Sequence, residues 1–362
     1  MPARVVFSVK IEDLAYAVEA MRHPALEGKP VIVGPDPRRG RGQVIASSDR
    51  AKAAGIMRSM EIRSAFKLLP GGVFLRPDKV AVKRLSDQLV SFFRDRADRV
   101  QRTAVDEFYL EMSAKADLGS PPDILARALI NEVLSRFQLD IAVGCGASKL
   151  VARIACGMVK PGCFMVVSPR DVRGFLFPLP VRQLPGVGGK TEGALRRMGI
   201  DTVGQLARVA RERLVEEFGP FGRRLHQIAC GVDESEVVPD EVRRSIVRSR
   251  VFEYDLDDVS VISKAVEGLS SEVFKALSDE RSFFRTVGVM LRFNDDHVKC
   301  RQSTIAAPTD RFEDLSKLTR GLLDEMLESP KPVRSMTIAL TGIGQRPSSQ
   351  KTMPEFTKNV SR

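Results

Sequence analysis

Two adjacent carboxylates, Asp106 and Glu107, are the residues in this chain with the clearest capacity for chemistry. They lie in the segment TAVDEFYLEM, where the flanking Val105 and Phe108 indicate a mostly buried strand. Burying two neighbouring negative charges is costly unless a cation neutralises them, and carboxylate oxygens are ligands that divalent ions such as Mg²⁺ prefer. The pair therefore predicts a divalent-metal site, with an exposed turn as the alternative.

A second segment, RQLPGVGGKTEGALRRMGI from Arg182, has the features of a phosphate-binding turn between two helices. Gly186 and Gly188 permit a tight turn and a close backbone approach, and a helix that starts after them points amide hydrogens outward. Lys190 and Arg196 add positive charge nearby. We therefore expect sequence-independent contact with a DNA backbone; a purely structural helical turn is the alternative.

A predicted strand over residues 243–252 supplies a third candidate for phosphate contact. By the two-residue period of a strand, Arg244, Arg248 and Arg250 share one face and Val247 lies on the other. A sheet with an open, arginine-rich face and helices on its other face would suit a phosphate backbone. A charged face that is merely solvated is the alternative.

Alternating strands and helices upstream predict an α/β domain that ends near Pro169 and positions the carboxylates. Residues 176–232 read as helices joined by short turns. The segment DESEVVPDE, residues 233–241, is acidic, contains Pro239 and has few apolar residues, which is typical of a linker.

The next hundred residues follow the order β-α-β-β-α-β, which is the split βαβ or ferredoxin-like arrangement. The expected strands cover residues 243–252, 284–293, 298–306 and 333–341, and the expected helices cover 259–277 and 312–327. The chain as a whole is therefore predicted to be a multidomain protein of the α/β and α+β classes.

Composition limits the partners and the compartment. The chain has 57 Lys and Arg against 46 Asp and Glu, and this net charge of +11 favours a polyanionic partner. No apolar run approaches the ~20 residues of a membrane span, and the N-terminus lacks a signal-peptide pattern. The five cysteines are scattered, without metal-ligand spacing, which fits a reducing compartment. We expect a cytoplasmic protein with no membrane partner.

The chain resembles Y-family DNA polymerases of the DNA polymerase IV (translesion) type from Val5 to about Gly342. The segments that carry the resemblance are VEAMRHPALEGKPVIVG, AVDEFYLEMS, VGCGASKLVARIACGMVKPG, LPGVGGKT and VRRSIVRSRVF. The resemblance implies a monomer that binds primer-template DNA, with Mg²⁺ as the cofactor if it is active. It implies a right-hand polymerase with palm and fingers (1–169), a helix-hairpin-helix thumb (170–232), a linker (233–242), a ferredoxin-like little finger (243–345) and a disordered tail (346–362).

The active site implied by the resemblance departs from the family pattern at its first metal ligand. The family's first strand carries an Asp that binds both metal ions, and the ungapped counterpart here, VKIEDLAYAVE from Val9, places Lys10 at that position. Two-metal catalysis needs carboxylates to hold the ions against the attacking and leaving oxygens. A lysine replaces a ligand by a cation, and we interpret Lys10 as neutralising Asp106 or Glu107 itself.

The positions that would contact an incoming nucleotide differ as well. The family's ribose-excluding aromatic aligns with Ala15, and the Tyr and Arg that grip the triphosphate align with Asp49 and Lys52. An acid at Asp49 opposes a triphosphate, and Lys52 keeps the charge but loses the bidentate fork. Lys160 does match the family's triphosphate-contacting lysine.

The C-terminal tail resembles a sliding-clamp (PCNA-type) interaction box. Gln350 is followed by an aliphatic residue at +3, Met353, and an aromatic residue at +6, Phe356. An extended tail can insert such apolar side chains into a pocket on the clamp. Thr357 stands where the box has a second aromatic residue, so we expect modest affinity.

Our leading hypothesis is a DNA-binding, clamp-binding paralogue of translesion synthesis in DNA repair, with polymerase activity lost or strongly weakened. Its role would be accessory: occupying lesions, recruiting partners or regulating an active polymerase. The alternative is an active error-prone polymerase whose Mg²⁺ site is rebuilt from Asp106, Glu107 and either Glu12 or Asp13, brought in by a local bulge. A different phosphoryl-transfer or nucleotide-sensing activity on the same scaffold is a third reading, which no P-loop or other motif supports.

Overall fold

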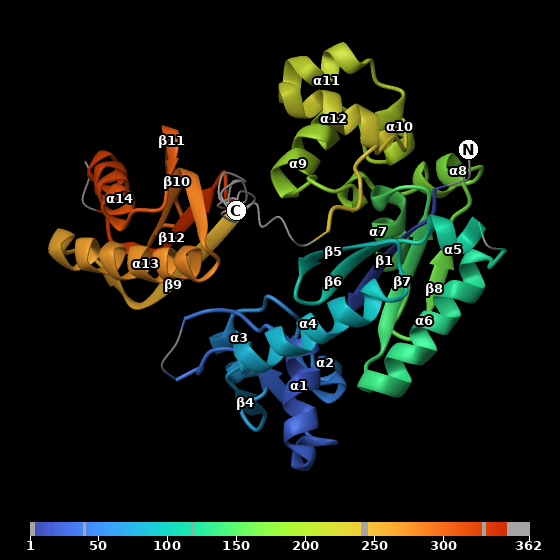
Figure 1. The fold of residues 1–362 in the computed structure, drawn as a ribbon, viewed down its shortest axis with the longest axis horizontal. Helices are drawn as coiled ribbons and strands as arrows, with labels where there is room; N and C mark the ends of the chain where they lie inside the picture. The colour runs from blue at the N-terminus through green and yellow to red at the C-terminus, as the bar shows by residue number, and fades with distance from the viewer. Residues whose placement is uncertain (1–3, 39–40, 118, 240–244, 328–330, 346–362) are drawn as a thin grey trace, which may run out of the picture. The chain divides into compact units, whose positions relative to one another are not determined.

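The computed structural model describes residues 4–38, 41–117, 119–239, 245–327 and 331–345. The chain forms two compact units (Figure 1): the first consists of residues 1–37 and 43–240, and the second of residues 38–42 and 241–362. None of the described helices is long and apolar enough to cross a membrane.

The first unit is built around a five-stranded sheet with the order β5-β6-β1-β7-β8. Its strands are β5 (Arg99–Ala104), β6 (Glu107–Glu111), β1 (Val6–Ile11), β7 (Ile141–Gly146) and β8 (Phe164–Val166). The central strand β1 is antiparallel to both neighbours. Phe7, Val9 and Ile11 of β1 are buried in a core shared with helices α4 (Lys79–Arg94) and α6 (Pro122–Phe137).

Helix α7 (Lys149–Gly157) packs on the sheet at β7 and β1. This approach depends on Gly144 in β7, because a Cβ there would come within 2.1 Å of the main-chain oxygen of Ala152. The close packing brings Cys156 against the sheet, where its thiol lies 3.4 Å from the main-chain oxygen of Ala142.

A smaller sheet and several helices complete the first unit. The sheet has the order β3 (Ala46–Ser47), β2 (Val31–Val33), β4 (Val73–Leu75). Around the two sheets lie α1 (Leu14–Arg22), η1 (Pro24–Leu26), α2 (Asp49–Ala53), α3 (Ile62–Leu68) and α5 (Ser113–Asp117). The segment predicted to be helical, residues 176–232, contains η2 (Val181–Gln183), α9 (Gly189–Arg197), α10 (Val203–Ala207), α11 (Arg211–Phe218) and α12 (Pro220–Ala229). With α8 (Val172–Leu176), which precedes it, and Leu150 and Ile154 of α7, it forms a second core.

The second unit has the predicted β-α-β-β-α-β order. Its elements are β9 (Ser245–Leu256), α13 (Val259–Asp279), β10 (Ser282–Phe293), β11 (Val298–Thr309), α14 (Phe312–Met326) and β12 (Val333–Thr341), followed by β13 (Gly344–Gln345). The main sheet is antiparallel with the order β11-β10-β12-β9, and β13 pairs with β10. Both helices share one core with one face of the sheet, so the opposite face is not covered by them.

The prediction that the arginines of β9 lie on the open face is wrong. Arg248 is paired in register with Ile338, which is buried in the core on the helix side. Directly paired residues point to the same face of a sheet, so Arg248 and Arg250 lie on the helix side. Arg250 is hydrogen-bonded there to Glu272 of α13. The two-residue period shows which residues share a face, but not which face the helices cover; Arg244 lies outside the described residues.

The described part of the predicted linker is held against the first unit. The amide of Leu150 at the start of α7 donates to the Asp233 carboxylate at 2.9 Å. The carboxylate of Glu236 pairs with Arg99 at 3.1 Å. Val237 is 1% exposed and is buried with residues of β1 and α7. Asp233 and Glu236 therefore each have a partner in the first unit, and the described part of this segment is not a free linker.

Val237→Ala should lower the free energy of unfolding of the first unit by about 2 kcal/mol, because it removes buried apolar surface and leaves a small cavity. The measurement is urea unfolding followed by circular dichroism. Val232→Ala, at a position 47% exposed in the same stretch, is the matched control and should change little. Equal effects of the two substitutions would show that Val237 contributes no packing.

Candidate functional site

The two predicted metal-binding carboxylates lie where β5 turns into β6. Asp106 is in the turn, 6% exposed, and its main-chain oxygen accepts a hydrogen bond from the amide of Ile11 at 2.9 Å. Glu107 begins β6 and is paired in register with Lys10 of β1. The structure thus brings the end of β1 beside both carboxylates, as the sequence predicted, and buries Asp106 where an exposed turn was the alternative.

Asp106 forms an ion pair with an arginine from a distant segment. A guanidinium nitrogen of Arg58, between α2 and α3, lies 3.0 Å from the Asp106 carboxylate. The arginine side chain is 52% exposed, whereas that of Asp106 is 8% exposed. Sequence reasoning missed Arg58, because nothing near it along the chain indicates its partner 48 residues away. The ion pair means that Asp106 already has a cation.

Lys10 is half-buried on the face of the sheet that α7 covers. Its charge and that of Glu107 both act on the buried thiol of Cys156 under α7. Burial raises the pKa of that thiol most strongly, a hydrogen bond with Ser8 and the charge of Lys10 lower it, and Glu107 raises it. The register of β1 and β6 identifies Glu107 as the residue opposite Lys10.

A second cluster of charges surrounds Lys52 of α2. Its ammonium lies 2.7 Å from Asp13, 3.3 Å from Asp49 and 3.8 Å from Glu12. Burial by itself would lower the pKa of Lys52, but the hydrogen bond and charge of Asp13, with Asp49 and Glu12, outweigh it and raise the pKa above its ordinary value. Lys52 therefore stays protonated and is held by three carboxylates.

The hypothesis that Glu12 or Asp13 restores the missing metal ligand through a bulge finds no support. The pairing of β1 with β6 and β7 is regular through Lys10, without a register shift. Asp13 follows the strand in a left-handed conformation (φ 51°) and accepts a hydrogen bond from the amide of Ser47 at 2.9 Å. Both acids instead pair with Lys52.

The donor set does not fit a pair of catalytic divalent ions. Two-metal sites need several carboxylates directed at the same ions. Here the Asp106 carboxylate binds Arg58, and Glu107 stands opposite a lysine. In the part of the chain that the structure describes, no group of three or more His, Cys, Asp or Glu side chains is arranged to hold a metal ion.

The remaining nucleotide-contact positions are distributed around this region. Ala15 is buried on α1, and its neighbour Tyr16 is partly buried. Burial, followed by the charges of Asp49 and Glu27, raises the pKa of the Tyr16 phenol. Lys160 is exposed in the turn between α7 and β8.

The predicted glycine turn lies directly before α9. Gly186 has a φ of +88°, and a Cβ there would lie 3.1 Å from the ring of Phe221, so the turn requires glycine. Gly188 is the N-cap of α9 and has open space around it. The first amides of a helix have no partner within it and can donate to an anion. Lys190, in the first turn of α9, is exposed.

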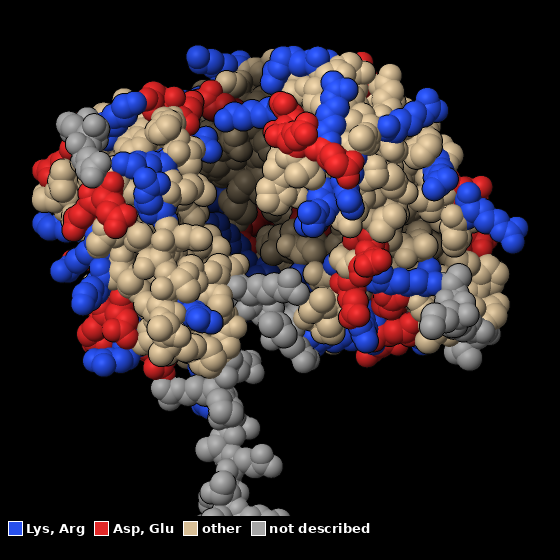
Figure 2. Space-filling model, turned by 90° about the horizontal axis from the view of Figure 1, so that it is seen from above, with Lys and Arg blue, Asp and Glu red and all other residues tan. Residues whose placement is uncertain are grey.

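Arg196 has a different environment from Lys190. It lies 3.0 Å from Glu192, which is 9% exposed and also pairs with Arg182 at 3.3 Å. Because Glu192 balances part of this positive charge, Arg196 is a weaker candidate for phosphate contact than the sequence indicated. On the face shown in Figure 2, Lys and Arg side chains are interspersed with Asp and Glu and do not form one continuous patch.

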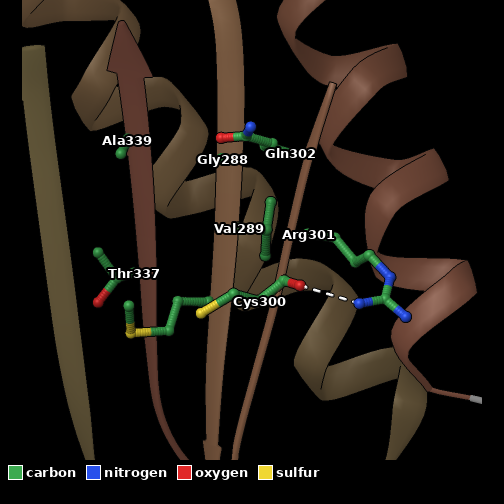
Figure 3. Close-up of a pocket in the computed structure, with 8 residues that line it drawn as sticks. Gly288, Val289, Cys300, Arg301, Gln302, Thr337 and Ala339 are labelled. Carbon is green, nitrogen blue, oxygen red and sulfur yellow. Dashed lines mark hydrogen bonds between the residues drawn. The ribbon is translucent and has the colours of Figure 1, made fainter. Parts of the chain in front are cut away.

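The open face of the second unit carries a shallow pocket that sequence reasoning did not find (Figure 3). It has a volume of about 300 Å³ and is lined by residues of β10, β11 and β12, among them Gly288, Cys300, Gln302, Thr337 and Ala339. The nearby hydroxyls of Ser249 and Thr337 are hydrogen-bonded at 2.8 Å. This surface is dominated by small and uncharged side chains, unlike the arginine-rich surface that was expected. The alternating small and hydroxyl residues in the sequence of β12 could have predicted this uncharged surface.

Three family models match the chain. The model of the impB/mucB/samB family matches residues 11–157, and the model of that family's C-terminal domain matches residues 243–353. Between them, residues 182–233 match the model described as the DNA polymerase-iota thumb domain. Together the three models span both units.

Curated relatives and solved structures agree with these matches. A DNA polymerase IV of Methanoculleus marisnigri is 35% identical over 98% of both chains, and a DNA polymerase IV 2 of Methanosarcina mazei is 34% identical over 98% of this chain and 96% of the relative. A Y-family DNA polymerase chimera of Dbh and Dpo4 has a similar fold, with a TM-score of 0.83 at 21% identity, covering 94% of this chain and all of that chain. DinB from Sulfolobus solfataricus gives a TM-score of 0.63 at the same identity and coverage.

Lys190→Ala should weaken DNA binding and reduce the slope of log affinity against log salt by about 1, since one phosphate contact is lost. Arg250→Ala should leave the slope unchanged, because Arg250 bonds Glu272 on the helix side of its sheet. Fluorescence anisotropy of labelled duplex at several salt concentrations measures both. Equal losses of DNA affinity in the two variants would indicate that the β9 arginines contact DNA, as the sequence had predicted.

Proposed function

The chain belongs to the Y family of DNA polymerases, in its DNA polymerase IV group, and from this premise we propose that it holds primer-template DNA while its capacity to add nucleotides is lost or strongly weakened. The observation that carries the proposal is Lys10, paired with Glu107 at the strand position where the family binds its metal ions. A protonated lysine at this position repels the ions that align the attacking and leaving oxygens.

The surrounding contacts support the same conclusion. Arg58 forms an ion pair with the Asp106 carboxylate. Lys52 forms ion pairs with Asp13 and Asp49. A nucleotide triphosphate would have to displace Asp13 and Asp49 from Lys52 and then approach the negative charge of Asp49. The Arg58 ion pair therefore opposes metal binding at Asp106, and the acids around Lys52 oppose binding of the triphosphate.

DNA holding uses other parts of the fold. The glycine turn and the exposed Lys190 at the start of α9 offer donors to a phosphate backbone, independently of the carboxylates. The net charge of +11 favours the same partner. We propose an accessory role at DNA lesions for a protein that binds primer-template DNA without extending it.

An active error-prone polymerase is the competing function. It is favoured by one observation, the retention of Asp106 and Glu107 side by side at the β5–β6 turn. If DNA and nucleotide displaced Arg58 and turned Lys10 away, these two carboxylates could hold Mg²⁺. This function requires both cations to move in the ternary complex.

We expect no primer extension above that of an Asp106→Ala/Glu107→Ala control, with either Mg²⁺ or Mn²⁺, while both proteins bind the duplex. Extension is measured on a labelled primer, and binding is measured on the same preparations. Extension that disappears in the control would establish a working polymerase with an unusual metal site, and it would refute the proposal.

We also propose that residues 346–362 bind a PCNA-type sliding clamp through Gln350, Met353 and Phe356. These residues lie outside the described part of the chain, so the proposal is supported by their spacing alone. Clamp attachment would increase the local concentration of the protein at DNA.

Deleting residues 346–362 should abolish clamp binding and leave DNA affinity nearly unchanged, as measured by surface plasmon resonance against PCNA and by anisotropy with duplex. Met353→Ala/Phe356→Ala should reproduce the deletion, whereas Glu355→Ala, between the two anchor residues, is the control and should retain binding. Clamp binding that survives the deletion would exclude the tail as the binding segment.

A further inference from the structure

We propose that Lys10 and Arg58 replace the divalent ions of this fold as permanent countercharges of Glu107 and Asp106, so that the site is stable without metal. The proposal deepens the proposed function, on which it rests, because it states why the two carboxylates persist in a site that does not fit metal. The proposal rests on the positions of two cationic side chains, Arg58 and Lys10, which different parts of the first unit hold in place.

Arg58 is directed at Asp106 by the backbone that follows it. Ser59 adopts a left-handed conformation (φ 67°), and its amide donates to the main-chain oxygen of Val44 at 2.9 Å. This bond ties the segment to the strand region beside Ile45, which in turn bonds β2. The guanidinium then reaches the buried carboxylate of Asp106 at 3.0 Å. A buried carboxylate needs such a partner, because leaving it without a cation is costly.

The direction of the Lys10 side chain is set by the burial of its two neighbours on β1. Val9 and Ile11 are 0% and 1% exposed on the core side of β1, so Lys10 must point to the opposite side, towards α7. Regular pairing places it opposite Glu107 on one side and Ala142 on the other. Among the described residues neither Lys10 nor Glu107 forms an ion pair, so their relation rests on the register, which sets the two residues directly opposite each other on neighbouring strands.

A divalent ion approaching Glu107 would meet this ammonium at short range. Replacing the ammonium by a carboxylate changes the local charge by two units and supplies the missing third acid. Lys10→Asp should therefore convert the site from one that excludes metal to one that depends on it. In the absence of metal the new carboxylate stands opposite Glu107 where the ammonium stood, so the variant should be less stable than the wild type.

The test uses the full chain, with Mn²⁺ as the probe. Electron paramagnetic resonance of free Mn²⁺ measures binding, and thermal unfolding in EDTA and in excess Mn²⁺ measures stability. Lys10→Asp should bind Mn²⁺ at least about tenfold more tightly than the wild type. Its melting temperature should be below that of the wild type in EDTA and should rise by roughly 5 °C in saturating Mn²⁺, whereas that of the wild type should stay constant.

Lys264→Asp, at an exposed position on α13, is the matched control and should show neither effect. If Lys10→Asp does not fold, Lys10→Ala provides the same comparison, since removing the ammonium alone should strengthen Mn²⁺ binding over the wild type. Wild-type protein that binds and is stabilised by Mn²⁺ as strongly as the Lys10 variants would overturn the proposal.

The Mn²⁺-binding experiment and the primer-extension experiment can fail independently of each other. Wild-type protein that extends primers, yet takes up Mn²⁺ at least about tenfold more weakly than Lys10→Asp, would refute the loss of activity and support Lys10 as a resident cation. Wild-type protein that is inactive but binds Mn²⁺ as tightly as Lys10→Asp would refute the resident cation and leave the loss of activity intact.

Discussion

The pairing of β1 between β6 and β7 is the constraint on which the candidate site depends. Phe7, Val9 and Ile11 are fully buried on one face, and a shift of one residue would exchange them for Ser8 and Lys10. The hydrophobic core therefore fixes the register, and the register places Lys10 opposite Glu107. The position of the cation is a consequence of burial elsewhere on the strand, which explains how a lysine can be held beside the family's metal-binding carboxylates.

The charges of the site form a self-contained set. Asp106 is paired with Arg58, Asp13 and Asp49 are paired with Lys52, and Glu107 stands opposite Lys10 in the strand register. Fixed side chains differ from bound ions in one important respect: they cannot follow the reacting oxygens as charge develops during a reaction. A site neutralised by its own residues can preserve the fold of a polymerase while losing the mobile cations on which the chemistry depends.

In the proposed function, different elements of the fold carry DNA holding and nucleotide addition. The turn at Gly186 and α9 pack in the helical core through Val187 and Leu195, whereas the carboxylates lie at the β5–β6 turn. In the second unit, the open face around Thr337 and Ala339 is small and uncharged, while the arginines of β9 lie on the helix side. Contact between that open face and DNA would rely on shape and hydrogen bonding more than on counterion release.

The sequence by itself determined the elements, the family and the identity of the altered position. Hydrophobic periodicity and turn residues are local, so they predicted the β-α-β-β-α-β unit, the glycine turn and the strand that carries Glu107, whereas the resemblance to the family placed Lys10. It did not determine which face of β9 the helices cover, that Asp233 and Glu236 attach their segment to the first unit, or that Arg58 is the partner of Asp106. These features join residues far apart in the chain, and only tertiary packing decides which distant side chain reaches a buried charge.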